Sequence, residues 1–290
     1  MGLGSRRRLA ALGAIVLLLS VFPGMVLPGA VHAAGPIDGG ARPTASARRD
    51  VSLRPDASCD LATVAALSAR RPAVRQFVVL ATAGFGATTG DAFMAARRAD
   101  GRWMCQTATV AASFGANGTR PLADRRSGDD TTPAGVFPLG VVTAWDGQTF
   151  NVFGNDPDPG VRSNVTYRSV RNEDCWGATP GASSYNHLVN RPNCPGPSDE
   201  WLPRFVDAYS HAVVIGANLD PISGDAPGET PYAAAIFLHR TSYTASGQPK
   251  PTSGCVSLGP ADLVTFVRLL DPSLGTHFAI GPTDWLRSTA

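Results

Sequence analysis

The chain has 290 residues, of which 43% are hydrophobic and 17% charged, a balance typical of a globular protein with one sizeable core. Its 25 basic and 23 acidic residues leave a net charge of +2, and its arginines are scattered apart from short runs such as Arg70-Arg71. This pattern excludes the clustered basic face with which proteins bind nucleic acid, so no nucleic-acid partner is expected.

The first 33 residues have the pattern of an export signal. Three arginines, Arg6 to Arg8, precede an uncharged apolar run from Leu9 to Phe22, and Val31-His32-Ala33 offers small residues at the positions that signal peptidase reads. We therefore expect a signal peptide over residues 1–33. The alternative is an uncleaved membrane anchor, and only then would the chain contact a membrane. Both interpretations place the rest of the chain outside the cytoplasm, as a secreted or cell-envelope protein.

Residues 34–55 are rich in Gly, Pro, Ala and Arg and lack an apolar period, which predicts a flexible linker. From residue 56 to 290 we expect a single, mainly β domain, sandwich- or barrel-like, with a few peripheral helices. Strand-length apolar segments are Gln76–Thr82, Ala92–Ala99, Arg102–Thr109, Gly135–Val142, His211–Gly216 and Ala233–Leu238. Asp100-Gly101, between the second and third of them, predicts a hairpin turn.

Two segments predict helices. Ser58–Arg70 carries alanines and leucines at helical spacing. Near the C-terminus a helix is expected to begin at Gly259-Pro260 and to end at Asp271-Pro272, with an apolar stripe of Leu263, Phe266, Val267 and Leu270 between them. The stretch from Gly154 to Pro203 is rich in Asn, Pro and Gly. Its length is typical of a functional loop or lid.

An exported chain with five cysteines cannot pair all of them in disulfides. The natural reading pairs Cys59 with Cys105 and Cys175 with Cys194, although four cysteines allow three connectivities. Cys255 is then left over, and a leftover cysteine is catalytic, buried and inert, or joined to a second chain. No Cys-x-x-Cys or His-x-x-x-His spacing occurs, so we expect neither a metal site nor a cofactor.

The most informative segment joins His239, at the end of an apolar run, to a Gly-containing turn at Cys255. Thiol catalysis needs a thiolate, and a histidine near the sulfur can remove its proton. Gly254 allows a tight turn in which successive N–H groups point to one spot and stabilise an oxyanion. The alternative is that His239 only caps a strand at the surface.

Phe237-Leu238-His239-Arg240, followed by Thr252-Ser253-Gly254-Cys255, resembles the signature of the L,D-transpeptidase (YkuD-like) catalytic domain family. In that family a histidine precedes a Ser/Thr-His-Gly-Cys turn. Gly128–Phe137 resembles its Gly-Asp…Thr-Pro-x-Gly-x-Phe segment, and the two matches together span most of residues 75–271. Within the second match, Asp129-Asp130 is read as a turn rather than as paired acid–base carboxylates.

The resemblance implies a mechanism on peptidoglycan stem peptides. The Cys255 thiolate would attack a stem-peptide carbonyl and release D-alanine, and an acceptor amine would then resolve the thioester, with His239 moving the protons. It also implies that the carbonyl of Arg240 orients His239 and that the N–H groups of Ser253, Gly254 and Cys255 hold the oxyanion.

Two positions depart from the family pattern. Ser253 replaces the usual histidine of the turn, and Ser257 stands where Arg or Asn is common. The altered turn at Ser253 leaves open a non-catalytic, disulfide-braced protein that binds the cell wall. A separate alternative is an L,D-carboxypeptidase, in which water instead of an amine resolves the thioester.

Overall fold

A computed structural model describes residues 58–194, 196–219 and 232–289. The predicted signal peptide and the whole of the predicted linker lie outside these residues. Most regular structure in the described part is β, accompanied by three α-helices, which confirms the expected fold class. None of these helices has the length and apolar character needed to cross a bilayer.

The described residues form one large mixed sheet, two small sheets and three helices. The helices are α1 (Leu61–Arg70), α2 (Pro260–Leu269) and α3 (Thr283–Ser288). Along the large sheet the strands are β10 (Tyr167–Ser169), β9 (Val152–Gly154), β14 (Ala212–Val214), β15 (Phe237–Arg240), β16 (Val256–Leu258), β4 (Val110–Ser113), β2 (Thr89–Arg97), β1 (Gln76–Thr82), β17 (His277–Pro282), β6 (Thr132–Pro138) and β5 (Thr119–Pro121), and β3 (Trp103–Cys105) pairs with β2. The small sheets are β12 (Leu188–Asn190), β11 (Asp174–Trp176) and β13 (Glu200–Trp201), and β7 (Val142–Thr143) with β8 (Thr149–Phe150).

The large sheet curls so that β6 returns toward β14. Beyond the end of β6, Leu139 forms a bridge to Ile215, and the N–H of Gly140 donates to the carbonyl of Val214 at 2.9 Å. Strands that are far apart in the sheet order are therefore joined by backbone hydrogen bonds. The result is the barrel-like form of sandwich expected from the sequence.

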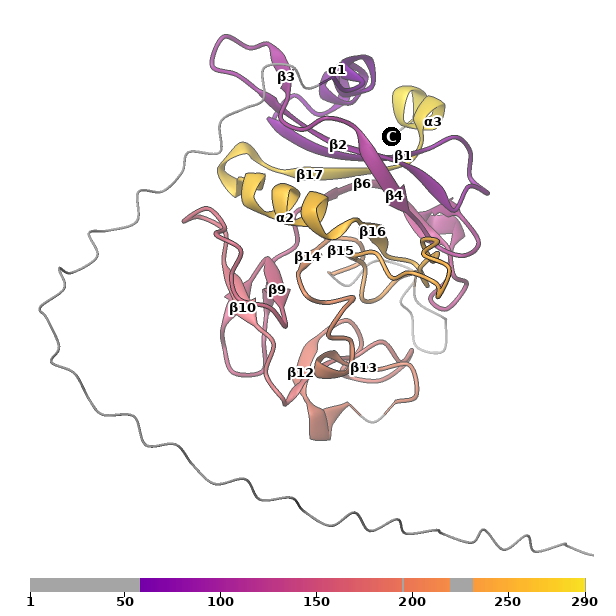
Figure 1. Cartoon of the computed structure of the whole chain (residues 1–290), viewed down its shortest axis with the longest axis vertical. Helices are drawn as coiled ribbons and strands as arrows, with labels where there is room; N and C mark the ends of the chain where they lie inside the picture. The colour runs from indigo at the N-terminus through magenta and orange to yellow at the C-terminus, as the bar shows by residue number, and fades with distance from the viewer. Residues whose placement is uncertain (1–57, 195, 220–231, 290) are drawn as a thin grey trace, which may run out of the picture. The chain divides into compact units, whose positions relative to one another are not determined.

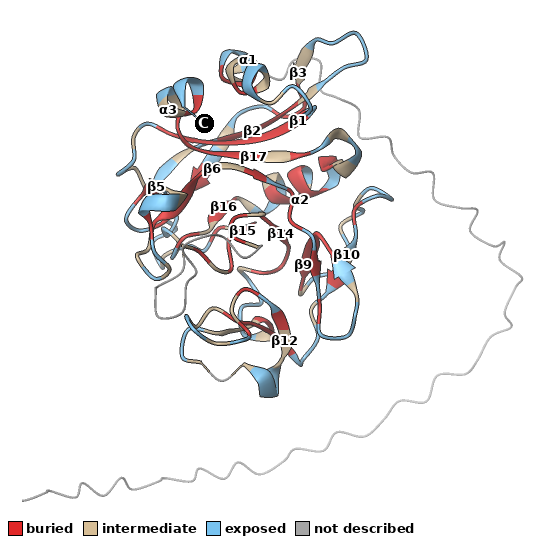
Figure 2. Ribbon diagram, turned by 180° about the vertical axis from the view of Figure 1, so that it is seen from behind, coloured by how far each residue is buried: buried red, intermediate tan, exposed pale blue. Residues whose placement is uncertain are grey.

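Helices cover both faces of the centre of this sheet. Helices α1 and α3 lie together on one side of β1, and α2 lies on the other (Figure 1). Phe77 and Val79 accordingly pack with α1 and α3, whereas Val78 and Leu80 enter the larger core with α2. Strand β1 is buried at all seven positions, which explains why its residues 77–81 form a continuous apolar run rather than an alternating pattern (Figure 2).

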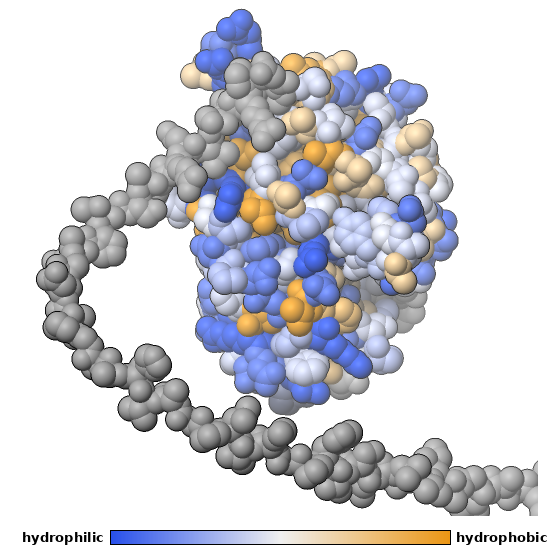
Figure 3. Space-filling view, viewed as in Figure 1, coloured by the Kyte–Doolittle hydropathy of each residue, from blue (hydrophilic) through white to orange (hydrophobic). Residues whose placement is uncertain are grey.

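Apolar surface elsewhere is broken up. The face shown in Figure 3 carries small apolar patches separated by polar residues. Among the described residues, the most exposed large apolar side chains are Val141 and Val206. The apolar content of the sequence therefore serves mainly the interior.

Several predicted boundaries are wrong. Helix α1 begins at Leu61 rather than Ser58, because Asp60 caps it by accepting from the N–H of Thr63 at 3.1 Å. The strand expected over Gly135–Val142 runs instead from Thr132 to Pro138. Arg102–Thr109 contributes only Trp103–Cys105, although the hairpin with β2 is present. His211–Gly216 shortens to Ala212–Val214.

The strand expected over Ala233–Leu238 begins only at Phe237. Ala235 has a φ of 53°, in the left-handed region, which is incompatible with an extended chain. The segment before β15 is therefore a bend, and its position beside the cysteine turn matters for the site.

The stretch from Gly154 to Pro203 is not a plain loop. It contains β10 and the three-stranded sheet β12-β11-β13. Arg168, almost fully buried, donates to the carboxylate of Asp174 at 2.7 Å and to that of Asp146 at 2.9 Å. This ion-pair network stabilises an insertion whose sequence has few apolar residues.

The structure pairs Cys59 with Cys105 and Cys175 with Cys194, and Cys255 is free. The first bridge ties the segment before α1 to β3. The second ties β11 to the residues that follow β12, and so braces the insertion from which β13 carries Glu200.

Candidate active site

His239 lies on β15, and Cys255 lies in the turn immediately before β16, the neighbouring parallel strand. In the register of β15 and β16, His239 lies opposite Ser257, so Cys255, two residues earlier, lies diagonally across from it. Side chains alternate between the faces of a strand, and Leu238 and Val256 point into the main core. His239 and Cys255 therefore emerge together on the other face, although 16 positions separate them in the sequence.

This shared face rests on an aromatic cluster. Cys255 packs against the apolar group that contains Trp176, Tyr209 and Phe237. Tyr209 also lies edge-on to the imidazole of His239, with ring centroids 5.6 Å apart. The cluster removes water from both groups, and this desolvation dominates their ionisation.

The sulfur of Cys255 is held by two backbone groups of the bend before β15. The thiol donates to the carbonyl of Ala235 at 3.1 Å, and the N–H of Phe237 donates to the sulfur at 3.4 Å. Because a carbonyl can only accept, the first contact requires the protonated thiol.

Burial and, to a smaller extent, the negative charge of Glu200 together raise the pKa of the Cys255 thiol to about 12, against the opposing effects of the Phe237 N–H and of Arg125. At neutral pH the resting group is therefore a thiol. The surroundings of the sulfur are too apolar to stabilise a resting thiolate, so the thiolate that the chemistry needs must form when a base removes the proton.

The imidazole of His239 is oriented by its own neighbour. Its Nδ1 lies 2.8 Å from the carbonyl oxygen of Arg240, the contact that the resemblance implies for that carbonyl. Since the carbonyl accepts, Nδ1 carries the hydrogen, and Nε2 of the neutral ring keeps a free lone pair. Burial lowers the pKa of His239 to about 4, so this neutral tautomer persists at neutral pH.

The turn that carries Cys255 is fixed by two threonines. The hydroxyls of Thr252 and Thr132 donate to the carbonyl of Cys255 at 2.6 and 3.1 Å. Thr132 belongs to the Gly128–Phe137 segment, so both sequence motifs meet at this carbonyl. Gly254 has a φ of 142°, which favours glycine, and lies against Thr131.

One of the three expected oxyanion donors is already engaged, because the N–H of Gly254 donates to the hydroxyl of Thr252 at 3.2 Å. The N–H groups of Ser253 and Cys255 find no acceptor among the described residues. Ser253, in the place of the usual histidine, is exposed at the rim of the pocket.

Asp129 forms the predicted turn. Its carboxylate accepts from the N–H groups of Arg126 and Thr131 at 3.0 and 2.9 Å, and these bonds help to lower its pKa although burial opposes them. It also pairs with the guanidinium of Arg125 at 3.3 Å. Asp129 is therefore committed to structure rather than to acid–base work.

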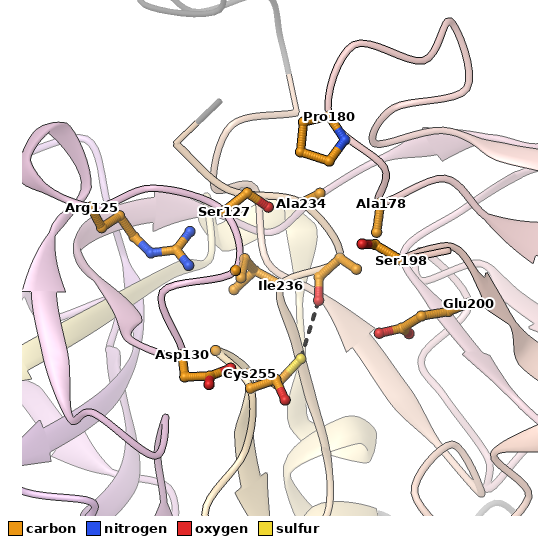
Figure 4. Close-up of a pocket in the computed structure, with 14 residues that line it drawn as sticks. Arg125, Ser127, Asp130, Ala178, Pro180, Ser198, Glu200, Ala234, Ile236 and Cys255 are labelled. Atoms are coloured by element: carbon orange, nitrogen blue, oxygen red, sulfur yellow. Dashed lines mark hydrogen bonds between the residues drawn. The ribbon is translucent and has the colours of Figure 1, made fainter. Parts of the chain in front are cut away.

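Cys255 lines a cavity of about 200 Å³, and the sequence did not predict two charged residues of its lining, Arg125 and Glu200. Arg125 and Glu200 lie on opposite sides of the sulfur (Figure 4). Tyr209, outside the lining, donates from its hydroxyl to the carboxylate of Glu200. No sequence motif could have found these residues, because Arg125 precedes one match and Glu200 lies in the irregular insertion.

A scan of the sequence against protein families matches residues 93–278 to the L,D-transpeptidase catalytic domain (YkuD). The match covers well over half of the chain and includes His239, Cys255 and the Gly128–Phe137 segment. The protein therefore belongs to the L,D-transpeptidase catalytic domain family, whose members act on peptidoglycan stem peptides. Searches of curated proteins and of solved structures found no significant match.

Proposed function

We propose that this protein is an exported peptidoglycan L,D-transpeptidase in which Cys255 is the nucleophile and His239 the proton carrier. The observation that carries the proposal is the register of β15 and β16, which places the one free cysteine among the described residues two positions before the strand partner of a histidine whose Nδ1 is held by the carbonyl of Arg240. The two disulfides suit a compartment outside the cytoplasm, and residues 1–33 would supply the export signal.

In the first half-reaction the sulfur forms a bond to the stem-peptide carbonyl while the thiol proton moves to Nε2 of His239. The C–N bond to D-alanine breaks, and the leaving amine takes that proton. A thioester remains on Cys255. Since both groups are neutral at rest, proton transfer accompanies the attack instead of preceding it.

In the second half-reaction an acceptor amine attacks the thioester carbonyl and gives a proton to His239. The C–S bond breaks, the new C–N bond is complete, and His239 returns the proton to the sulfur. In both steps the N–H groups of Ser253 and Cys255 would hold the oxyanion. Water in place of the amine would make the same site a carboxypeptidase.

Mass spectrometry of muropeptides incubated with the purified protein tests this proposal. New cross-links are expected, with a covalent intermediate on Cys255 that is absent from Cys255→Ala. Loss of terminal D-alanine alone would assign a carboxypeptidase. Unchanged muropeptides, with no adduct on Cys255, would favour a wall-binding protein and contradict the proposal. A carbapenem should likewise add once to the wild type, and an adduct on Cys255→Ala would refute the assigned nucleophile.

A further inference from the structure

Glu200 is a carboxyl group in the wall of the cavity that contains Cys255. It is half-buried on β13, and its side chain projects toward the sulfur from the side opposite Arg125 (Figure 4). Burial raises the pKa of Glu200 to about 7 against the hydrogen bond from Tyr209, so a nearby cation would favour its charged form, and that charge opposes ionisation of the thiol. A cationic group bound by Glu200 would offset this unfavourable effect on the nucleophile.

The protein itself leaves this carboxylate incompletely paired. Among the described residues it accepts one hydrogen bond, from the hydroxyl of Tyr209, and takes part in no salt bridge. Arg125, the basic residue of the same cavity, is turned to Asp129 and to the carbonyl of Tyr232. Buried carboxylates without a cationic partner are costly, and a ligand cation can remove that cost.

Tyr209 holds this carboxylate in place. The phenol is almost fully buried, and its ring packs edge-on against Phe237 and His239, with centroids 5.7 and 5.6 Å away. Burial and the neighbouring Glu200 raise the pKa of Tyr209 well above its usual value, so its hydroxyl remains a donor at neutral pH. Tyr209 thus holds one oxygen of the carboxylate, and the other oxygen remains able to accept a hydrogen bond from a group in the cavity.

We propose that Glu200 is a specificity-determining residue that binds an ammonium group of the peptidoglycan substrate beside Cys255. A carboxylate and an ammonium form charge-assisted hydrogen bonds, which are stronger than neutral ones, and a half-buried position partly shields them from water. Two sources supply this chemistry, the side-chain amine of the diamino acid in the donor stem and the acceptor amine of the second stem. The inference takes its substrate, peptidoglycan, from the proposed function. It adds that Glu200 is the residue by which the site distinguishes a charged amine from an uncharged group.

The two sources are distinguished by measuring each half-reaction separately. Glu200→Gln keeps the shape and the acceptor for Tyr209 but removes the charge, and Glu173→Gln, on an exposed neighbour of β11, is the matched control. Acyl-enzyme formation is followed by mass spectrometry with a donor tetrapeptide whose side-chain amine is free and with one whose amine is acetylated. Resolution of the thioester is followed with an amine acceptor and with hydroxylamine, which is uncharged at neutral pH.

Glu200→Gln is expected to slow the step that brings the ammonium by about tenfold or more, a change typical of losing a hydrogen bond to a charged group. The acetylated donor and hydroxylamine should react within about twofold of the wild type. An effect on the first step assigns the ammonium to the donor, and an effect on the second step assigns it to the acceptor. Equal loss with charged and uncharged probes, or no loss at all, would overturn the inference.

Binding alone separates this inference from the proposed function. Calorimetry on Cys255→Ala, with and without Glu200→Gln, measures the affinity for the same donor and acceptor peptides without any chemistry. Weaker binding of the free-amine peptides alone supports the ammonium site even if the wild type forms no acyl-enzyme. Equal affinities for all peptides contradict it even if transpeptidation is observed.

Discussion

The sulfur of Cys255 lies 3.1 Å from the carbonyl oxygen of Ala235, a residue with a φ of 53°. The left-handed backbone turns this carbonyl toward the thiol and away from the ladder of β15. Asn186 supports the bend, because its side-chain oxygen accepts from the N–H of Ala235 at 3.2 Å. Strained backbone at a functional site persists only where its surroundings determine it.

Ala235→Gly should therefore leave the fold unharmed and raise the free energy of unfolding by up to about 1 kcal/mol, because glycine adopts this φ without the clash of a Cβ atom. Ala234→Gly is the matched control. It lies next in the chain but outside the left-handed region, so it should lose about 0.5–1 kcal/mol. Urea denaturation of both variants measures the difference. A loss at Ala235 equal to that at Ala234 would show that the bend stores no strain.

His239→Gln should reduce the rate of acyl-enzyme formation by about 10²- to 10⁴-fold, the usual range for loss of a general acid–base group. His277→Gln is the control, because that imidazole makes a similar 2.8 Å contact to the carbonyl of Gly275 but lies on β17, which pairs with β1 and β6 rather than with β15 or β16. It should retain the wild-type rate. Equal rates for the two variants would remove His239 from the mechanism.

The pH profile of the wild type follows from the same histidine. Because the pKa of His239 is lowered to about 4, its neutral form should remain down to about that pH instead of being lost near 6.5. The neutral imidazole also contributes to the free energy of unfolding. Because the pKa of His239 is lower in the folded than in the unfolded chain, this contribution is complete above pH 6.5 and is lost as the pH falls toward 4. Because Glu200 in the same cavity has a pKa of about 7, initial rates of acyl-enzyme formation between pH 4 and 8 are compared for the wild type and Glu200→Gln. A fall centred near 6.5 that persists in Glu200→Gln would contradict the buried, neutral imidazole.

The sequence predicted the two residues proposed to react in this site, but it did not predict how their environment shifts their pKa values. His239, Cys255 and the Gly128–Phe137 segment are recognisable because motif residues keep local spacing, and β1 is recognisable because a strand buried on both faces is continuously apolar. The ionisation of Cys255 could not be predicted. It depends on Phe237, which strand register brings to the sulfur, and on Tyr209, which packs against Phe237. It also depends on Glu200, which lies in an insertion whose sequence has no clear hydrophobic period.

Charge around the thiol can be tested by alkylation. Arg125 favours the thiolate, so Arg125→Gln should raise the pKa of Cys255 further and slow its reaction with iodoacetamide at a fixed alkaline pH. Arg126→Gln removes the same charge from an exposed neighbour and should have little effect. Glu200→Gln should change the rate in the opposite direction, because it removes a negative charge. If all three variants react alike at pH 9, the cavity charges do not control the sulfur.

The insertion that carries Glu200 contains a buried ion pair. The side chains of Arg168 and Asp174 are both only 1% exposed, and Asp174 also accepts from the indole of Trp145 at 2.9 Å. Arg168→Met would leave this carboxylate buried without its cation, and we expect a loss of about 3–5 kcal/mol in the free energy of unfolding.

Arg171→Met is the control for this loss, since Arg171 pairs with Asp146 but is about half exposed, and such pairs contribute about 0–1 kcal/mol. Thermal and denaturant unfolding give the two values. If Arg168→Met unfolds like the control, the buried pair is not what stabilises the insertion. If it instead abolishes acyl transfer while the main sheet stays folded, the insertion behaves as a separate cooperative unit that must be ordered for Glu200 to face Cys255.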